Sequence, residues 1–235
     1  MRCNTERGAL GDKRVRKALS LALDRESLIE NVVQGGQEPA RGIVPPFGGY
    51  ESPGTVRTDA AEARRLLAEA GFPGGAGFPD FKLLITDRDT AKKLGEAIQG
   101  MWRDELGIRV RIEQMEWGSY LQSQFEKQYD LALGGWIGDY LDPTTFLDMW
   151  VTDGGNNNTS WSNRDYEALL TEGEHTAGVA ERLAVLRRAE TILLAEEPVI
   201  PVYWYTTNYL IHPAVKNWNP MLLSHQPYKF VRLEP

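Results

Sequence analysis

The sequence has 235 residues, of which 42% are hydrophobic and 25% are charged, and its formal net charge is −7. This composition is typical of a soluble globular protein, and the length fits one large domain or two small ones. Basic residues are scattered among acidic ones, which argues against a nucleic-acid-binding surface, and the single cysteine excludes an intrachain disulfide.

The first half of the chain predicts helices and strands in alternation. Asp12 is a suitable N-cap for a helix whose apolar residues follow helical spacing, and Asp24 begins a shorter helix that ends at Gly35. Residues 37–56 are rich in Gly and Pro and predict a long loop, while Asp59 and Glu62 predict a capping box. Further helices are expected at 60–70, 90–106 and 117–126, and strands at 81–85, 108–112 and 129–133.

The second half predicts helices at 144–150, 165–172 and 177–195. Residues 199–205 predict a buried strand, which the internal Pro201 places at an edge or a bend of a sheet. Residues 228–233 predict a terminal strand. Strands separated by helices favour a mixed α/β layer fold.

No motif of an enzyme is present. The sequence lacks a nucleophile elbow, a phosphate-binding P-loop, a dinucleotide fingerprint and the zinc-protease motif. Cys3 lies in a terminus that we expect to be frayed, so a catalytic thiol is not expected. His175, His212 and His225 show no ligand spacing, and we expect no metal and no cofactor.

No apolar run approaches the ~20 residues that span a bilayer. The N-terminal residues 1–7 have no apolar core and do not predict a signal peptide. If the protein is exported, we expect its signal to lie upstream of this chain.

The densest group of candidate ligand-binding residues is the segment 134–143, which follows a predicted strand directly. Glycines allow close approach of a ligand, and Trp136 offers a flat apolar surface. A loop aspartate such as Asp139 can bind an ammonium group through charge-assisted hydrogen bonds. The alternative is a strand-to-helix turn in which Asp139 or Asp142 caps the next helix, because turn chemistry selects the same residues.

Two further groups of polar residues each allow more than one interpretation. Asn157 lies in a polar turn that either is solvated or presents a side-chain amide to a peptide main chain. Asp139 and Asp142 together suggest a glycoside hydrolase, but Pro143 marks Asp142 as a helix-start residue, and no opposing carboxylate is apparent.

Four stretches, in order, resemble the second half of the dipeptide- and oligopeptide-binding proteins, family 5 of the bacterial extracellular solute-binding proteins. They are residues 12–25, residues 63–72, the motif Gly135-Trp136 with Asp139-Tyr140 and Asp142-Pro143, and residues 198–203. The resemblance covers essentially the whole chain. It implies the mixed-sheet α/β lobe of a type II (cluster C) periplasmic-binding-protein-like fold that lacks most of the N-terminal lobe. Residues 1–205 would form the second ligand-binding lobe, and residues 206–235 a tail that crosses back to the first.

The resemblance also implies site residues. Asp139 would pair with the α-ammonium group of a peptide, with Trp136 beside it, and Trp117 would line a side-chain pocket. Backbone groups at Gly134 and Gly135 would pair with the peptide in strand fashion. The expected ligand-binding residues are therefore Asp139, Trp136, Trp117, Gly134, Gly135, Tyr140 and Asn157.

The sequence departs from the family pattern at two positions. Leu133 and Gln124 stand where some oligopeptide-binding members carry arginines. The group that holds the carboxylate end of a peptide is therefore expected to differ, which leaves ligand length and class open.

The implied function is the binding of oligopeptides for uptake by an ABC importer, without catalysis. An oligosaccharide receptor of the same family is the first alternative, and a hydrolase-like enzyme is the less favoured one. The implied partners are a peptide or other small solute, the membrane permease and the missing first lobe, in a periplasmic or extracytoplasmic location. We expect the isolated chain to bind peptide weakly and its exposed half-cleft to favour a homodimer.

Overall fold

A computed structural model gives the fold and describes residues 1–219, 223 and 227–234, so His225 lies outside the described residues. The centre is a four-stranded sheet with the order β1–β5–β3–β4. Its members are β1 (Arg2–Cys3), β5 (Leu131–Ala132), β3 (Phe81–Thr86) and β4 (Val110–Met115). Strand β3 pairs in parallel with β4 and β5, whereas β5 and β1 are antiparallel, so the sheet is mixed as expected.

Helix α4 (Asp89–Leu106) connects the parallel strands β3 and β4. Leu94, Ile98 and Trp102 are buried on one helix face, because residues three to four positions apart lie above one another. The helix ends at Gly107, whose φ of 68° is left-handed and suits a residue without a Cβ atom. The predicted helix and its end are confirmed.

The sheet carries helices on both faces because side chains alternate along β3. Leu83 and Ile85 join the core that includes residues of α1 (Lys13–Leu21), α3 (Ala60–Glu69) and α4. Leu84 points to the opposite face and packs with Tyr120 of α5 (Trp117–Phe125). Each fully buried leucine or isoleucine contributes about 1.5–3 kcal/mol to folding.

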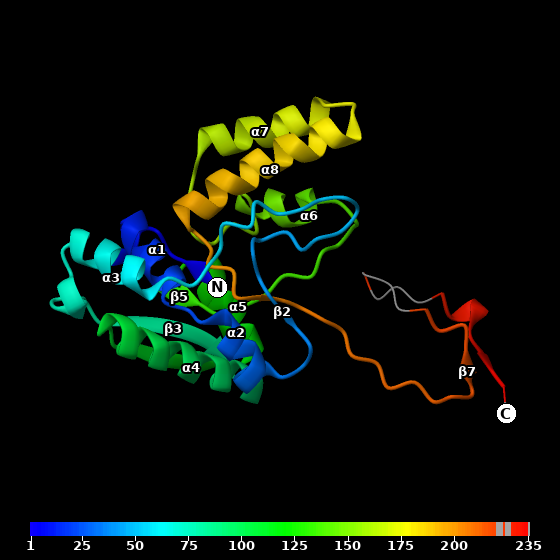
Figure 1. The fold of residues 1–235 in the computed structure, drawn as a ribbon, viewed down its shortest axis with the longest axis horizontal. Helices are drawn as coiled ribbons and strands as arrows, with labels where there is room; N and C mark the ends of the chain where they lie inside the picture. Colours follow the sequence, from blue (N-terminus) through cyan, green and yellow to red (C-terminus); the bar gives the residue numbers. More distant parts are fainter. Residues whose placement is uncertain (220–222, 224–226, 235) are drawn as a thin grey trace.

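A second core lies away from the sheet (Figure 1). Helices α7 (Arg164–His175) and α8 (Val179–Glu196) form an antiparallel hairpin, and the short α6 (Thr144–Leu147) lies beside it. The expected long loop at residues 37–56 is not structureless: it contains β2 (Glu38–Pro39), and Tyr50 contributes to this second core.

The predicted helix starts are confirmed at three aspartates. The Asp12, Asp24 and Asp59 carboxylates accept hydrogen bonds from the N–H groups of the residues two to three positions ahead. Asp24 begins α2 (Arg25–Leu28), which continues as a π-helical turn to residue 33. The predicted capping box is only half formed, because the Asp59 N–H group donates to the Leu21 carbonyl and the Glu62 side chain bonds Arg65.

The predicted strands near the C-terminus are wrong in extent. Only β6 (Tyr203–Trp204) forms within residues 199–205, where it pairs with β2, because Pro201 has no N–H group to donate. Residues 228–233 begin with a 3₁₀ turn and end in β8 (Arg232–Leu233), which pairs with β7 (Val215–Lys216).

The expected frayed N-terminus is also wrong. Cys3 lies in β1 and is fully buried, and burial raises the pKa of its thiol to about 12. Short-range sequence patterns do not reveal this pairing, because β1 bonds to β5, which is more than one hundred residues away.

After β6 the chain leaves the body of the molecule and runs out toward β7 (Figure 1). Its last described contacts with the body include the Thr206 hydroxyl and the Asn208 amide, which both donate to the Gly35 carbonyl. The division of the chain at residue 205 stays a prediction. None of the helices in the described ranges is long and apolar enough to cross a membrane.

Candidate functional site

The segment 134–138 leaves the sheet at β5 and runs toward α6 as irregular backbone (Figure 1). The preceding Leu133 is still in the sheet, since its N–H group donates to the Leu84 carbonyl at 2.8 Å. Within the described residues, no hydrogen bond involves the main chain of residues 134–138. Gly134, Gly135 and Ile137 are exposed, so this segment offers main-chain donors and acceptors to another chain.

The first two of the three glycines in the segment are required by tyrosine rings. A Cβ atom on Gly134 would lie 2.5 Å from the Tyr120 hydroxyl, and one on Gly135 would lie 2.2 Å from the Tyr205 hydroxyl. The Tyr120 hydroxyl also donates to the Leu133 carbonyl at 2.9 Å, which fixes its ring beneath the segment. Close ligand approach was the expected reason for these glycines, but the packing of the protein itself already demands them.

The two aspartates of the segment have different environments. Asp142 accepts two hydrogen bonds from the Arg182 guanidinium, at 2.7 and 2.9 Å, and one from the Thr144 N–H group at 3.0 Å. Partial burial raises the pKa of Asp142, but the bonds from Arg182 and Thr144 outweigh it and leave that pKa lowered. Asp142 therefore starts α6, and its ion pair removes it from a catalytic carboxylate pair.

Asp139 is exposed, as expected. Its N–H group donates to the Thr145 hydroxyl at 2.9 Å, which fixes the backbone at this position. Its carboxylate has no hydrogen-bond or ion-pair partner anywhere in the part of the chain that the structure describes. A carboxylate held on a fixed backbone without a partner is available to an external cation.

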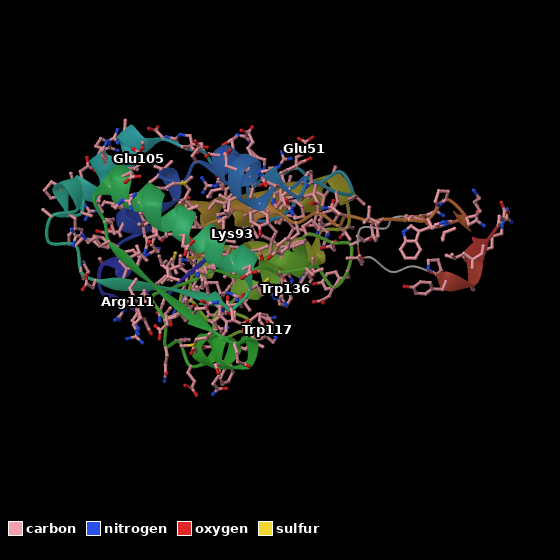
Figure 2. All side chains as sticks on the ribbon, turned by 90° about the horizontal axis from the view of Figure 1, so that it is seen from below. Glu51, Lys93, Glu105, Arg111, Trp117 and Trp136 are labelled. Carbon is pink, nitrogen blue, oxygen red and sulfur yellow. The ribbon has the colours of Figure 1, made fainter. Side chains whose placement is uncertain are left out.

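Aromatic side chains surround the segment. Trp117 is 54% exposed and stacks on Tyr120, with ring centroids 5.7 Å apart and planes 17° apart. Trp136, labelled in Figure 2, is half-buried and packs against the second core. Tyr140 is exposed, and its hydroxyl lies 3.2 Å from that of Thr144. Trp117 and Tyr140 present apolar surface to solvent, whereas Trp136 mainly anchors the segment.

The expected ligand role of Asn157 does not fit the structure. Its amide is buried and donates to the carbonyls of Trp150, Val151 and Trp161, while its oxygen accepts from the backbone and hydroxyl of Thr159. The side chain closes a turn of the protein itself and has no group left for a peptide. A polar turn and a buried turn-closing asparagine look alike in sequence, because both need a side chain that bonds the local backbone.

The site contains one cation that the sequence analysis did not identify. Gln124 is buried and accepts a hydrogen bond from Arg2 at 2.6 Å, so it turns away from solvent. Arg88, two residues after the end of β3, instead places its guanidinium 5.9 Å from the centroid of the Trp117 ring. Its position at the carboxyl end of a parallel strand is the signal that could have identified it, because ligand sites of α/β sheets gather there.

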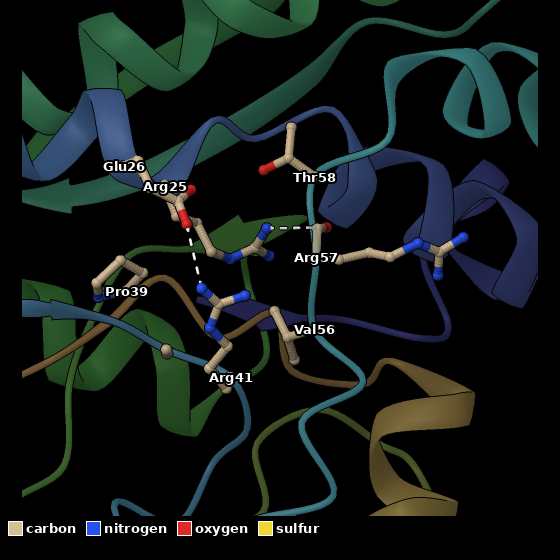
Figure 3. Close-up of a pocket in the computed structure, with 8 residues that line it drawn as sticks. Arg25, Glu26, Pro39, Arg41, Val56, Arg57 and Thr58 are labelled. Carbon is tan, nitrogen blue, oxygen red and sulfur yellow. Dashed lines mark hydrogen bonds and ion pairs between the residues drawn. The ribbon is translucent and has the colours of Figure 1, made fainter.

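A cavity of about 240 Å³ lies elsewhere, beside α2 (Figure 3). The buried Arg25 guanidinium at its wall donates to the Pro201 carbonyl at 2.8 Å and to the Ser20 carbonyl and hydroxyl. Figure 3 shows Arg41 turned toward Glu26 and the Arg57 side chain turned away from the cavity. These bonds connect α1, α2 and the chain before β6, so the arginine at this cavity holds the fold together.

Metal binding has no support in the described ranges, where no group of three or more His, Cys, Asp or Glu side chains could hold an ion. The exposed Asp139 carboxylate follows segment 134–138 directly, and the Arg88 guanidinium lies over the exposed ring of Trp117. Together with the unbonded main chain, these groups are suited to hold an organic ligand by hydrogen bonds and charge.

Comparison with known proteins identifies relatives of this chain in both sequence and structure. The oligopeptide-binding protein OppA of Bacillus subtilis is 34% identical over 216 residues, which are 88% of this chain and 40% of that protein. The periplasmic oligopeptide-binding protein OppA of Salmonella typhimurium is 32% identical over 90% of this chain and 40% of its own length. A crystal structure of a periplasmic oligopeptide-binding protein from Borrelia burgdorferi superimposes with a TM-score of 0.90 and 31% identity, over 99% of this chain and 47% of that one.

The chain therefore spans somewhat less than half of the proteins it matches. The structural likeness confirms the mixed α/β, periplasmic-binding-protein-like fold inferred from the sequence. Residues 1–158 match the description "Bacterial extracellular solute-binding proteins, family 5 Middle". The chain belongs to family 5 of the bacterial extracellular solute-binding proteins, a family of binding proteins and not of enzymes.

Proposed function

We propose that this chain supplies one wall of a peptide-binding site in a receptor for ABC-transporter-mediated uptake. The observation that carries the proposal is the free Asp139 carboxylate next to main chain that makes no hydrogen bond in the described residues. An extended peptide pairs with such a segment through its own backbone, and its α-ammonium group finds the carboxylate at the end. Relatives that are named oligopeptide-binding proteins support this ligand class.

Backbone pairing makes the recognition tolerant of peptide sequence, because the main-chain groups are the same in every peptide. The exposed Trp117 ring gives a flat apolar surface on which ligand side chains of different shapes can lie. The proposed role is therefore the capture of peptides as a class.

We also propose that a second wall completes the site. Apolar side chains lie exposed on α5 and on the segment after β5, among them Phe125 at 70%, Ile137 at 73% and Leu141 at 59%. Apolar surface of this kind is usually covered by a partner. The partner here would be the other lobe of a receptor that closes around its ligand, outside the cytoplasmic membrane and next to its permease. With one wall alone, peptide binding is weak, and two chains can cover each other's exposed face.

An oligosaccharide receptor is the second candidate, favoured by the aromatic rings of Trp117 and Tyr140 beside a carboxylate. Sugars do not carry an ammonium group and do not pair with backbone in strand fashion. A binding experiment with both kinds of ligand therefore distinguishes a peptide receptor from a sugar receptor. A thermal-shift screen compares tetraalanine with cellobiose at millimolar concentration. We expect stabilisation by tetraalanine, and stabilisation by cellobiose alone would refute the peptide proposal.

The direct test is the variant Asp139→Asn. It keeps the size of the side chain and removes its charge, so affinity for tetraalanine should fall by about 10- to 100-fold, the value of a hydrogen bond to a charged group. Titration followed by ¹⁵N–¹H NMR measures weak affinities of this kind. N-acetyltetraalanine, which has no ammonium group, should bind the wild type and the variant equally.

The matched control is Asp80→Asn, which removes an exposed carboxylate immediately before the first residue of β3. It has the same effect on net charge and should leave the affinity unchanged. Equal affinities of wild type and Asp139→Asn for tetraalanine would exclude Asp139 as the ammonium site.

A further inference from the structure

The place of Asp139 depends on the first turn of α6, which follows it in the chain. The Asp139 N–H group donates to the Thr145 hydroxyl at 2.9 Å, and Thr145 is buried. Gly138 also lies against this turn, because a Cβ atom on it would come 3.0 Å from the Cγ2 atom of Thr145. The backbone that carries the Asp139 carboxylate is therefore held by Thr145.

Asp142 organises this first turn of α6. Its main-chain carbonyl accepts a hydrogen bond from the Thr145 N–H group at 3.1 Å. Its carboxylate accepts hydrogen bonds from the N–H group and the hydroxyl of Thr144, at 3.0 and 2.8 Å. Helix α6 has only four residues, and a helix of this length is not stable by itself in water. The turn therefore depends on contacts from outside α6.

The outside contact at the start of α6 comes from Arg182, in the first turn of α8. Its two terminal nitrogens donate to the two carboxylate oxygens of Asp142, at 2.7 and 2.9 Å, and such a bidentate pair fixes orientation as well as distance. The two side chains are only 26% and 30% exposed, so salt screens this pair less than a surface pair.

Helix α8 is a rigid support for this arginine. It has 18 residues, and Leu186 and Ala189 bury it in the second core. Leu147, at the other end of α6, is buried in the same core. The second core therefore holds the end of α6 by apolar packing and its start by the ion pair of Arg182 with Asp142.

We propose that Arg182 is a positioning residue of the ligand site: through Asp142 and the first turn of α6, it holds the Asp139 carboxylate where the α-ammonium group of a peptide meets it. The inference rests on the proposed peptide function and adds to it a residue on another helix that acts without touching the ligand.

The charge of Arg182 by itself acts in the opposite direction. A positive charge near the site repels an ammonium group, and the ion pair keeps the Asp142 carboxylate from attracting one. If charge alone mattered, a neutral residue in place of Arg182 would strengthen the binding of a free ammonium group. Positioning predicts that the same substitution weakens it, so the sign of the change separates the two effects.

The test measures how much the ammonium group of the ligand contributes to affinity. The probes are tetraalanine and N-acetyltetraalanine, and NMR titration of the full chain gives their affinities for the wild type, Arg182→Gln and Arg182→Lys. Arg188→Gln is the matched control, because it removes a positive charge from the same helix, where its ion pair with Glu172 is exposed at both side chains. Spectra recorded without ligand show whether each variant is folded.

The wild type should bind tetraalanine more tightly than the acetylated peptide. Arg182→Gln should reduce this ratio of affinities by about threefold to tenfold, which is part of the value of a hydrogen bond to a charged group. Affinity for the acetylated peptide should stay the same. Arg182→Lys keeps the charge without the two parallel bonds and should retain part of the ratio, and Arg188→Gln should leave both affinities unchanged.

An unchanged or larger ratio in Arg182→Gln would overturn the inference and leave the peptide function in place. An equal loss of affinity for both peptides would also overturn it, since Arg182 would then only support the fold. If Arg182→Gln is unfolded, Arg182→Lys decides in the same way: a reduced ratio supports positioning and an unchanged ratio contradicts it. If the wild type binds the two peptides equally, or binds neither, the proposed role of Asp139 fails, and the inference fails with it.

Discussion

The substitution Glu190→Ala tests how the fold supports the binding wall. Glu190 lies on α8 and is fully buried. One of its oxygens accepts from the N–H groups of Ile43 and Val44, at 2.7 and 3.1 Å, and from the Ser52 hydroxyl at 2.9 Å. The other accepts from the Tyr50 hydroxyl at 2.6 Å. A single carboxylate thus holds the long loop before α3 onto the second core, against which Trp136 packs.

The alanine variant leaves these four donors without their acceptor. Each buried donor without a partner costs about 1–3 kcal/mol, but the variant also no longer has to bury a charged carboxylate, which offsets part of the loss. We therefore expect the free energy of unfolding to fall by about 2–4 kcal/mol in urea denaturation at neutral pH. The amides of Ile43 and Val44 should also exchange their hydrogens much faster.

The stability that Glu190 contributes should depend on pH, because burial disfavours its charged form. Burial raises the pKa of Glu190, and its hydrogen bonds only partly oppose this rise. The pKa of Glu190 is therefore higher in the folded protein than in the unfolded chain. Its carboxyl group contributes most to the free energy of unfolding at low pH, and part of that contribution is lost as the pH rises through the folded-state pKa. The difference in stability between wild type and Glu190→Ala should therefore be larger at pH 4 than at pH 8.

The control is Glu172→Ala, since the ion pair of Glu172 with Arg188 is exposed at both side chains. Exposed pairs contribute about 0–1 kcal/mol, so this variant should unfold almost like the wild type. The reasoning is refuted if Glu190→Ala costs less than about 1 kcal/mol, or if its effect grows as the pH rises.

Two further outcomes follow from buried and paired groups. Asp142→Asn should lower the free energy of unfolding by about 1 kcal/mol at pH 7, because it weakens the two bonds from Arg182. The pKa of Asp142 is lowered in the folded protein. The stability that its charge contributes is therefore fully present above the usual carboxyl pKa, and it is lost as the pH falls through the lowered, folded-state pKa. The urea denaturation curves of Asp142→Asn and the wild type should therefore converge in acid. The Cys3 thiol, with its pKa raised to about 12 by burial, should not react with a thiol reagent at pH 8 until the protein unfolds, and rapid labelling of the folded chain would contradict its burial.

Local patterns predicted the helices well because the causes of a helix lie within a few residues. Asp12 and Asp59 cap the helices they were expected to cap, and Gly107 ends α4. The strands near the C-terminus were overestimated, because a strand exists only where a partner supplies hydrogen bonds. Within residues 199–205, only Tyr203 and Trp204 pair with β2, while Val199 makes an isolated bridge to Arg2 and the Ile200 N–H group donates to the Met1 carbonyl.

The candidate site was predicted only in part, because the partners of its side chains are distant in the sequence. The sequence identified segment 134–143 but could not say which aspartate caps the helix. The choice depends on Arg182, which is 40 residues away in the chain and reaches Asp142 but not Asp139. Asn157 was misjudged because its bonding partners become apparent only when the turn is closed.

By itself the sequence determined the class of fold, the family and the segment that carries the candidate site, because spacing, capping residues and ordered motifs are properties of short stretches. Tertiary structure decided which side chains are free. Asp142 and Asn157 are bound by the protein's own groups, while the side chain of Asp139 remains open to solvent. Whether a charge is satisfied depends on groups that folding brings within about 3 Å, and distance along the chain does not report that separation.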